Sequence, residues 1–297
     1  MTAASNSLHQ NGTVLALHCS LGSGRQWTKL TAELWGSYRV IAPSISGYAD
    51  GPISTDLPMS LAEEVEYLGP VIERADSPIH LVGHSYGGAI AFKIATASRF
   101  TDRIRSLTLI EPVLPTLLKE NPADRRLYDL FVQLARRVSA DLYEGMYLEA
   151  VDRFVSYWNG SGPAERLSVE SRLRMIERVE KIAYDFTAAL SEENVASAAA
   201  GIRIPTLLIS GGLSPYLTQR IVGRLASTIA GADTHHLPAA GHMLPLTHGK
   251  LVNPLILAHI SRADDLASVS LASILQPRAF VATAQELESS TAPYEDR

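Results

Sequence analysis

The chain has 297 residues, of which 46% are hydrophobic and 19% are charged, and its formal net charge is −5. This apolar content is enough for one large core, or for a core with a smaller subdomain, and it excludes an intrinsically disordered chain. The mildly acidic balance, without any run rich in lysine and arginine, gives no indication of a nucleic-acid partner.

Three further features bear on the compartment in which the protein works. The N-terminal segment lacks the basic start and apolar stretch of a secretory signal. The longest apolar runs, such as Val14–Leu17 and Leu255–Ala258, are far shorter than a bilayer span. The single cysteine, Cys19, allows no intramolecular disulfide, which fits a reducing compartment. We therefore expect a soluble cytoplasmic protein without a membrane partner; these features do not bear on its oligomeric state.

Short apolar segments bounded by turn residues alternate with helical patterns along the chain. The expected strands are Thr13–His18, Tyr38–Ala42, Ile79–Gly83, Ser106–Ile110, Thr206–Ser210 and Thr234–Leu237. The expected helices between and after them are Gln26–Trp35, Leu61–Ala75, Tyr86–Ser98, Tyr216–Ala230 and Leu251–Arg262. Strands that are apolar throughout and separated by helices predict an α/β fold with a mostly parallel sheet of about six strands, covered on both faces.

Residues 113–200 interrupt this alternation. They carry only helical patterns, at Arg125–Val138, Leu142–Val155, Glu165–Ile182 and Thr187–Ala199. A block of helices between two strands predicts a cap over the carboxyl edge of the sheet. We therefore expect a core of residues 1–112 and 201–262, a helical cap of residues 113–200, and a C-terminal tail of residues 263–297. Within that tail, Leu266–Leu275 has a pattern that would allow one more helix.

The segment Gly83-His84-Ser85-Tyr86-Gly87 fits the pattern G-x-S-x-G and lies between a predicted strand and a predicted helix. A tight turn at this junction would strain the serine backbone and direct its hydroxyl away from the sheet. The helix that begins at Tyr86 would direct its N–H groups toward a developing oxyanion. The alternative is an ordinary glycine-rich turn. The strand before it and the helix after it favour Ser85 as a nucleophile.

A serine nucleophile needs a base, and the chain has nine histidines. His235 and His236 lie in a predicted strand, where packing or surface roles are expected. His248 precedes the last helix and is suited to capping it, and His84 lies inside the glycine-rich turn. His242 lies in a loop just after the last predicted strand, and we therefore expect it to be the general base.

The chain resembles the α/β-hydrolase superfamily in six blocks, which follow one another in the order typical of that family. They are residues 17–27, 40–51, 81–91, 109–112, 204–215 and 239–248. The resemblance covers about residues 13–112 and 201–262, and it is to the capped esterase, lactonase and C–C-hydrolase branch. It implies the α/β-hydrolase fold, with the cap inserted after the strand that ends at Ile110. One or both of the strands with which many relatives begin are short or missing here.

The resemblance also implies further site residues, and the chain departs from the family at two of them. Relatives carry His-Gly where this chain has His18-Cys19, and the next residue, Ser20, is the implied second backbone donor to the oxyanion, beside Tyr86. Ser214 occupies the place where relatives usually carry the acid of the triad. Some relatives take that acid from the end of the preceding core strand, where this chain has Glu111. We expect Glu111 to be the acid; a structural salt bridge or helix cap is the alternative.

These features predict a carboxylic ester hydrolase that acts on small to medium soluble esters or lactones through an acyl-serine intermediate. No metal-binding pattern, dinucleotide fingerprint or P-loop is found in the sequence, so we expect no metal and no cofactor. Trp27, Tyr157 and Trp158 are candidate substrate-binding residues, although aromatic residues of the cap are also suited to packing its own helices. The alternative functions are C–C bond hydrolysis or lyase chemistry on the same triad, and ligand reception without turnover.

Overall fold

The computed structural model describes residues 11–48, 57–119, 121–160 and 168–275. Six strands form one sheet in the order β2-β1-β3-β4-β5-β6, and every pair of neighbours is parallel. The strands are β1 (Thr13–Leu17), β2 (Arg39–Ile41), β3 (Ile79–His84), β4 (Ile104–Ile110), β5 (Thr206–Gly211) and β6 (Asp233–Leu237). The predicted α/β fold is therefore confirmed, with strand ends within about two residues of the expected positions.

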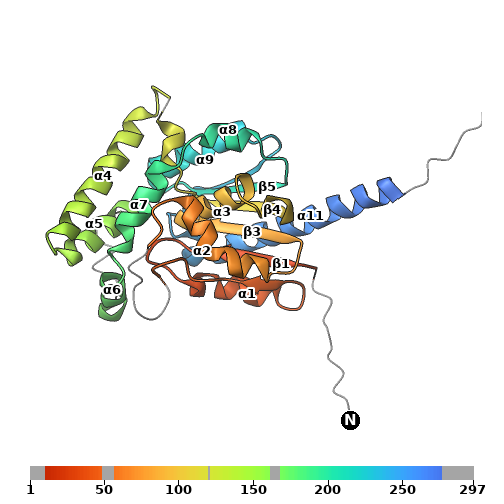
Figure 1. The fold of residues 1–297 in the computed structure, drawn as a ribbon, viewed down its shortest axis with the longest axis horizontal. Coiled ribbons are helices and arrows are strands. Elements are labelled where there is room, and N and C mark those ends of the chain that lie inside the picture. Colours follow the sequence, from red (N-terminus) through yellow and green to blue (C-terminus); the bar gives the residue numbers. More distant parts are fainter. Residues whose placement is uncertain (1–10, 49–56, 120, 161–167, 276–297) are drawn as a thin grey trace, which may run out of the picture.

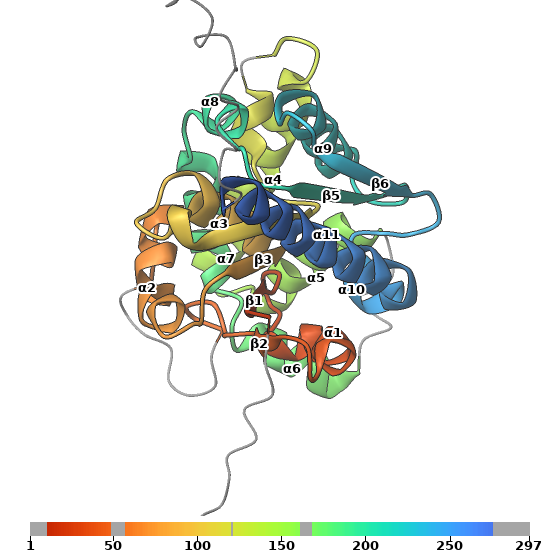
Figure 2. The same ribbon diagram turned by 90° about the vertical axis from the view of Figure 1, so that its right-hand side faces the viewer.

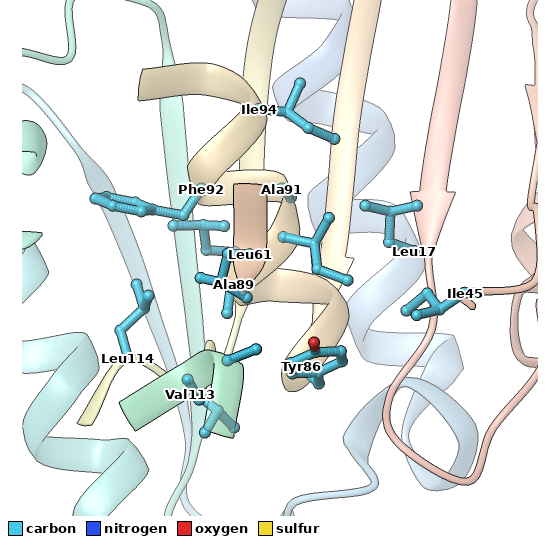
Figure 3. Packing of buried hydrophobic residues seen from close by; sticks show 14 of the residues in the cluster. Leu17, Ile45, Leu61, Tyr86, Ala89, Ala91, Phe92, Ile94, Val113 and Leu114 are labelled. Atoms are coloured by element: carbon cyan, nitrogen blue, oxygen red, sulfur yellow. The ribbon is translucent and has the colours of Figure 1, made fainter. Parts of the chain in front are cut away.

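The four central strands, β1, β3, β4 and β5, are buried because their side chains alternate between two apolar layers, whereas the edge strands β2 and β6 are largely exposed. In β1, Val14 and Ala16 join a cluster with helices of one face, whereas Leu15 and Leu17 join the cluster on the other face. The first face is covered by η1 (Gly24–Trp27), α1 (Thr28–Leu34), α10 (Leu244–Thr247) and α11 (Gly249–Leu275). The second face is covered by α2 (Leu61–Glu73), α3 (Tyr86–Thr96) and α9 (Tyr216–Thr228). Figure 3 shows the second cluster around α3, with the Tyr86 ring at its edge.

The described residues between β4 and β5 form helices and loops and contain no strand, and we call residues 113–200 the helical insertion. Its described helices are η3 (Pro115–Leu118), α4 (Arg125–Tyr143), α5 (Tyr147–Asn159), α6 (Val169–Ile176), α7 (Lys181–Ser191) and α8 (Val195–Ala200). Helices α4 to α7 lie together at one end of the sheet, opposite to the end from which α11 extends (Figure 1).

Two helices of the insertion are divided differently from the sequence prediction. The predicted helix Glu165–Ile182 begins outside the described residues, and the described part breaks at residues 177–180 before α7 begins. The predicted helix Thr187–Ala199 breaks after Ser191, where Asn194 adopts a left-handed backbone with φ of 57°. The apolar spacing continues across both breaks, so hydrophobic periodicity alone does not mark them.

The last helix, α11, continues to Leu275 rather than ending near Arg262. The predicted boundary at residue 263 therefore lies inside a helix, and residues 276–297 of the predicted tail lie outside the described residues. No glycine or proline interrupts the helix after residue 254, and Ala263 is still buried at 1% exposure. Figures 1 and 2 show α11 crossing the sheet and extending beyond it. Among the described residues, no helix combines the length and apolar character that a membrane span requires.

Candidate active site

Ser85 lies in the sharp turn between β3 and α3, where its backbone has φ of 57° and ψ of −121°. This conformation is strained for a residue with a side chain, and it is stabilised by the packing on both sides. A Cβ atom on Gly83 would come within 2.5 Å of the Gly87 carbonyl oxygen. A Cβ atom on Gly87 would come within 2.4 Å of the His18 carbonyl oxygen. The second glycine therefore allows the start of α3 to lie directly against the end of β1.

The structure brings Ser85, His242 and Glu111 together in one chain of hydrogen bonds. His242 Nε2 lies 2.9 Å from Ser85 Oγ, and His242 Nδ1 lies 2.6 Å from Glu111 Oε2. A carboxylate accepts hydrogen bonds, so Nδ1 carries the proton and Nε2 presents its lone pair to the serine hydroxyl. Each of the three side chains is at least 96% buried. This arrangement has the geometry of a nucleophile, its base and the acid that orients the base.

Glu111 is held in place from β5 and α9. Its Oε1 accepts a hydrogen bond of 2.7 Å from the Gly211 N–H, and Thr218 Oγ1 lies 3.5 Å from its Oε2. Its own backbone is left-handed, with φ of 46°. Ser214, at the position where relatives carry the acid, has a buried hydroxyl without a partner among the described residues. The acidic partner of His242 therefore follows β4, at the position that the sequence predicted.

The loop after β1 contains Ser20, the second predicted oxyanion donor, and it is fixed by a neutral histidine. His18 Nε2 accepts a hydrogen bond from the Ile45 N–H at 3.0 Å, while His18 Nδ1 donates to the Cys19 carbonyl at 2.8 Å. Burial lowers the pKa of His18 to about 4, so the ring is neutral near pH 7. Leu21 has φ of 56°, which makes this loop the third strained backbone segment at the site.

A second chain of hydrogen bonds joins this loop to the backbone of His242, and the sequence analysis did not predict it. The Cys19 N–H donates to Gln26 Oε1 at 3.2 Å, and the amide nitrogen of Gln26 donates to His84 Nδ1 at 3.1 Å. His84 Nε2 then donates to the His242 carbonyl at 2.8 Å. Burial and, to a smaller extent, the neighbouring His242 hold the pKa of His84 well below its usual value, so the His84 ring stays neutral. Gln26 and His84 are 58 residues apart, and no local pattern marks them as partners.

Ser85 lines two cavities formed by the described residues. The larger one is a cleft of about 890 Å³, lined on one side by the loop after β1 and on the other by the helical insertion. His242 lines this cleft. The smaller cavity has about 20 Å³, which is room for one water molecule or one methyl group. It is lined by Ser20, Tyr86 and apolar side chains that include Phe131 and Phe186, and His242 is not among its lining residues.

Of the three predicted substrate-binding residues, only Trp158 lines the cavities. It also stacks on His242, with ring centroids 4.3 Å apart and an interplanar angle of 22°. The prediction for Trp27 is wrong: this side chain is 1% exposed and packs in the cluster between the sheet and α11. Tyr157 lines neither cavity and packs instead on Phe131 and Trp158. Its helix directs it into the insertion's own aromatic core, which was the alternative for such residues.

A second serine–histidine–aspartate arrangement lies toward the amino ends of the strands, and its chemistry is different. His80 Nδ1 lies 2.8 Å from Ser106 Oγ, and His80 Nε2 lies 3.3 Å from Asp264 Oδ1. Asp264 also accepts a hydrogen bond of 2.7 Å from the Tyr38 hydroxyl. The serine and histidine are fully buried, and neither lines the cavities described above. These contacts fasten α11 to the sheet rather than expose a nucleophile.

Comparison with known proteins agrees with this fold. The chain is 24% identical over 246 residues to the probable protein phosphatase methylesterase 1 of Caenorhabditis elegans, covering 76% of this chain and 62% of that protein. It is 30% identical over 102 residues to the lipase LipV of Mycobacterium tuberculosis, covering 34% of this chain and 37% of that lipase. The chain thus spans less than two thirds of the length of either relative.

The solved structure of MenH from S. aureus superposes with a TM-score of 0.67 at 19% identity, over 86% of this chain and 95% of MenH. At that identity the superposition shows a shared fold. The sequence pattern of the alpha/beta hydrolase family matches residues 14–255, which include the turn at Ser85 and the loop of His242. This chain therefore belongs to the alpha/beta hydrolase family.

Proposed function

We propose that this protein is a serine hydrolase that cleaves carboxylic esters through an acyl-serine intermediate. The observation that carries the proposal is the chain from Ser85 Oγ through His242 to Glu111, with distances of 2.9 and 2.6 Å, at a strained strand-to-helix turn. The family membership supports hydrolysis, and a methylesterase and a lipase are among its relatives.

In this mechanism His242 Nε2 takes the proton of Ser85 as the hydroxyl oxygen attacks the ester carbonyl. The negative charge that develops on the carbonyl oxygen is stabilised by the backbone N–H groups of Tyr86 and Ser20. Tyr86 is the first residue of α3, so its N–H has no acceptor within the helix. The imidazolium, oriented by Glu111, then gives its proton to the ester's alcohol oxygen as the bond between that oxygen and the carbonyl carbon breaks, which leaves the acyl group on Ser85. Water, activated by the same imidazole, releases the acid from Ser85.

The two cavities indicate how an ester would lie in the site. The leaving alcohol has to receive its proton from His242, which lines the large cleft and not the small cavity. The alcohol therefore occupies the cleft of about 890 Å³, and the acyl group occupies the cavity of about 20 Å³. We propose short-chain esters, with an acetyl-sized acyl group on a larger alcohol, as the substrate class. In this arrangement the helical insertion acts as the cap, because Phe154 and Trp158 border both cavities.

The test compares hydrolysis of p-nitrophenyl acetate, butyrate and octanoate by the wild type and by Ser85→Ala. We expect wild-type kcat/KM to fall with acyl length, and Ser85→Ala to lose at least about a thousandfold in kcat. Ser214→Ala is the matched control, because it removes a buried hydroxyl that has no partner among the described residues. Unchanged hydrolysis in Ser85→Ala would contradict the mechanism, and a preference for octanoate would contradict the assignment of the small cavity.

A further inference from the structure

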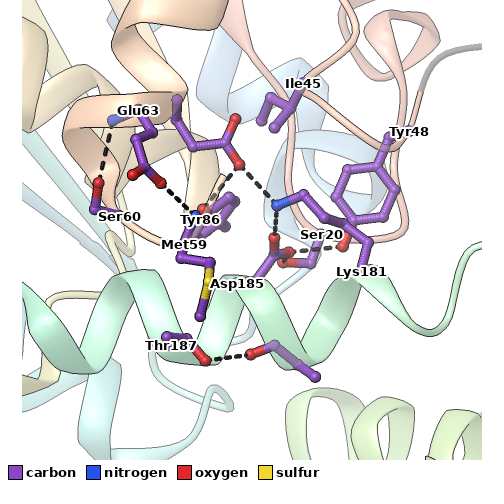
Figure 4. A network of polar contacts seen from close by, with 12 residues as sticks. Ser20, Ile45, Tyr48, Met59, Ser60, Glu63, Tyr86, Lys181, Asp185 and Thr187 are labelled. Carbon is purple, nitrogen blue, oxygen red and sulfur yellow. Dashed lines mark hydrogen bonds and ion pairs between the residues drawn. The ribbon is translucent and has the colours of Figure 1, made fainter. Parts of the chain in front are cut away.

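A buried polar cluster connects α7 of the helical insertion to α2 and to Tyr86 of the core (Figure 4). Lys181 Nζ donates a hydrogen bond of 2.7 Å to Glu64 Oε1 and a second, shorter one to Asp185 Oδ1. The exposed fractions of Lys181, Glu64 and Asp185 are 1%, 0% and 4%. We call these three residues the Lys181 cluster. The proposed mechanism assigns no step to any of them.

The Lys181 cluster holds the side chains of both residues whose backbone N–H groups are the proposed oxyanion donors. Ser20 Oγ donates a hydrogen bond of 2.5 Å to Asp185 Oδ2, and the Tyr86 hydroxyl donates one of 3.0 Å to Glu64 Oε1. The Lys181 ammonium binds both acids, so it links the two hydrogen bonds that hold the side chains of Ser20 and Tyr86. Its Nζ also lies 5.0 Å from the centre of the Tyr86 ring.

Attachment of the insertion to the core does not by itself account for this cluster. Removing an ammonium and two carboxylates from water costs several kcal/mol per ion, and apolar residues of similar volume are often as stabilising. A second ion pair, Lys93 with Glu192 at 2.9 Å, already connects α3 to the residue that follows α7, and it is more exposed. What distinguishes the Lys181 cluster from that pair is its contact with the two donor residues.

We propose that the Lys181 cluster is a positioning device that holds the backbone N–H groups of Ser20 and Tyr86 at the oxyanion site when α7 is docked. The inference rests on the proposed function, since it assigns a role to the same oxyanion donors. Stabilisation of the transition state then depends on the helical insertion, although no group of the insertion touches the oxyanion. Displacing a donor by a fraction of an ångström would lower the rate of reaction at Ser85 and leave ground-state binding of substrate unchanged.

The experiment removes the side-chain hydrogen bonds of Ser20 and Tyr86 and keeps their backbone N–H groups. Ser20→Ala and Tyr86→Phe each delete one hydroxyl, retain the backbone N–H, and leave the charges of the cluster in place, so both variants are expected to fold. Lys181→Met removes the ammonium group that joins Glu64 to Asp185, and it is the variant that is most able to destabilise the fold. Lys93→Met is the matched control, because it breaks an ion pair that also joins the core to the end of α7 but has no contact with Ser20 or Tyr86.

The primary measurement is the second-order rate at which a fluorophosphonate reacts with Ser85, because that reaction also develops charge on an oxygen in the oxyanion site. We expect Ser20→Ala and Tyr86→Phe each to slow it about tenfold, and Lys181→Met about a hundredfold, with Lys93→Met within about twofold of wild type. In ester hydrolysis the same variants should lower kcat by the same factors and leave KM within about twofold. Thermal unfolding establishes that each variant tested is folded.

The outcomes separate this inference from the proposed function. Wild-type rates of phosphonylation in both folded hydroxyl variants would overturn the positioning role, even if their melting temperatures fell as in Lys93→Met. If Ser85 reacts with the probe but no ester is hydrolysed, the ester proposal fails, and the phosphonylation rates still decide the positioning role. A wild-type Ser85 that does not react with the probe would overturn both.

Discussion

Replacing Glu111 by glutamine tests the acid of the candidate triad with little change of shape. The amide is nearly isosteric with the carboxylate, and its oxygen can still accept the hydrogen bond from the Gly211 N–H, 2.7 Å away in the wild type. Its NH₂ group then faces His242 Nδ1 in place of the oxygen that lies 2.6 Å away. Because an amide NH₂ donates, Nδ1 has to become the acceptor and the imidazole proton moves to Nε2. That nitrogen faces Ser85, which loses its base.

The size of the loss follows from the two arrangements open to the variant. Turning the amide around would restore the productive form of His242, but it would place the NH₂ group against the Gly211 N–H and leave that buried donor unpaired, at about 1–3 kcal/mol. The carboxylate charge that stabilises the imidazolium is lost in either arrangement, which adds about 1.5–3 kcal/mol. Together these terms amount to about 2.5–6 kcal/mol, and the middle of that range, about 4 kcal/mol, is about a thousandfold in kcat.

The assay is steady-state hydrolysis of p-nitrophenyl acetate by the wild type, Glu111→Gln and Glu33→Gln. Glu33 accepts a hydrogen bond of 2.8 Å from Asn253, between α1 and α11, so its variant applies the same chemical change away from the site. We expect a loss of about a thousandfold in kcat for Glu111→Gln, near-wild-type kcat for Glu33→Gln, and circular dichroism spectra like that of the wild type for both. A kcat for Glu111→Gln within about tenfold of wild type would refute the assignment of Glu111 as the acid.

Three further predictions follow from other contacts. Trp158→Ala should lower kcat by about tenfold because the indole no longer packs on the His242 ring, whereas Trp158→Phe should retain most of it; equal kcat values for both variants would contradict a role for the stack. Burial lowers the pKa of His259 to about 4, so below pH 6.5 the unfolded chain binds its proton before the folded chain does. Between pH 6.5 and 5 the free energy of unfolding of the wild type should therefore fall by about 1.5 kcal/mol more than that of His259→Gln, and parallel urea-unfolding profiles would exclude this. Burial raises the pKa of Cys19 to about 12, so a thiol reagent at pH 7.5 should modify it slowly in the folded protein and rapidly in urea; rapid modification of the folded protein would contradict its burial.

The strands and the turn at Ser85 could be predicted from the sequence because their causes are local. A strand buried on both faces is largely apolar, and Val14–Leu17 of β1 shows this within four residues. The turn needs small residues within contact distance of one another, so Gly83 and Gly87 report a constraint that acts inside five positions. Glu111 was predicted on two grounds: some members of the resembled superfamily carry the acid at the end of this strand, and an acid that ends an apolar strand needs a partner.

The partners of these residues depend on how distant segments pack. Trp27 and Trp158 look alike as sequence features, but η1 turns the first into the core and α5 turns the second onto His242. Hydrophobicity predicts that both rings are buried, but it does not distinguish the core from the wall of a cavity. The same reason explains why Trp27 was wrongly expected to bind substrate.

The sequence by itself predicted the parallel sheet and the turn at Ser85 from local patterns, and its resemblance to a family predicted that Glu111 and His242 would lie near that serine. The tertiary structure alone decided what surrounds them. Lys181 meets Glu64 across 117 positions, and Asp185 meets Ser20 across 165, through contacts that exist only when α7 is docked on the core. Helical periodicity gave no sign of them, because a buried lysine and a solvated one occupy the same kind of position in a helical pattern until the neighbouring surface is known.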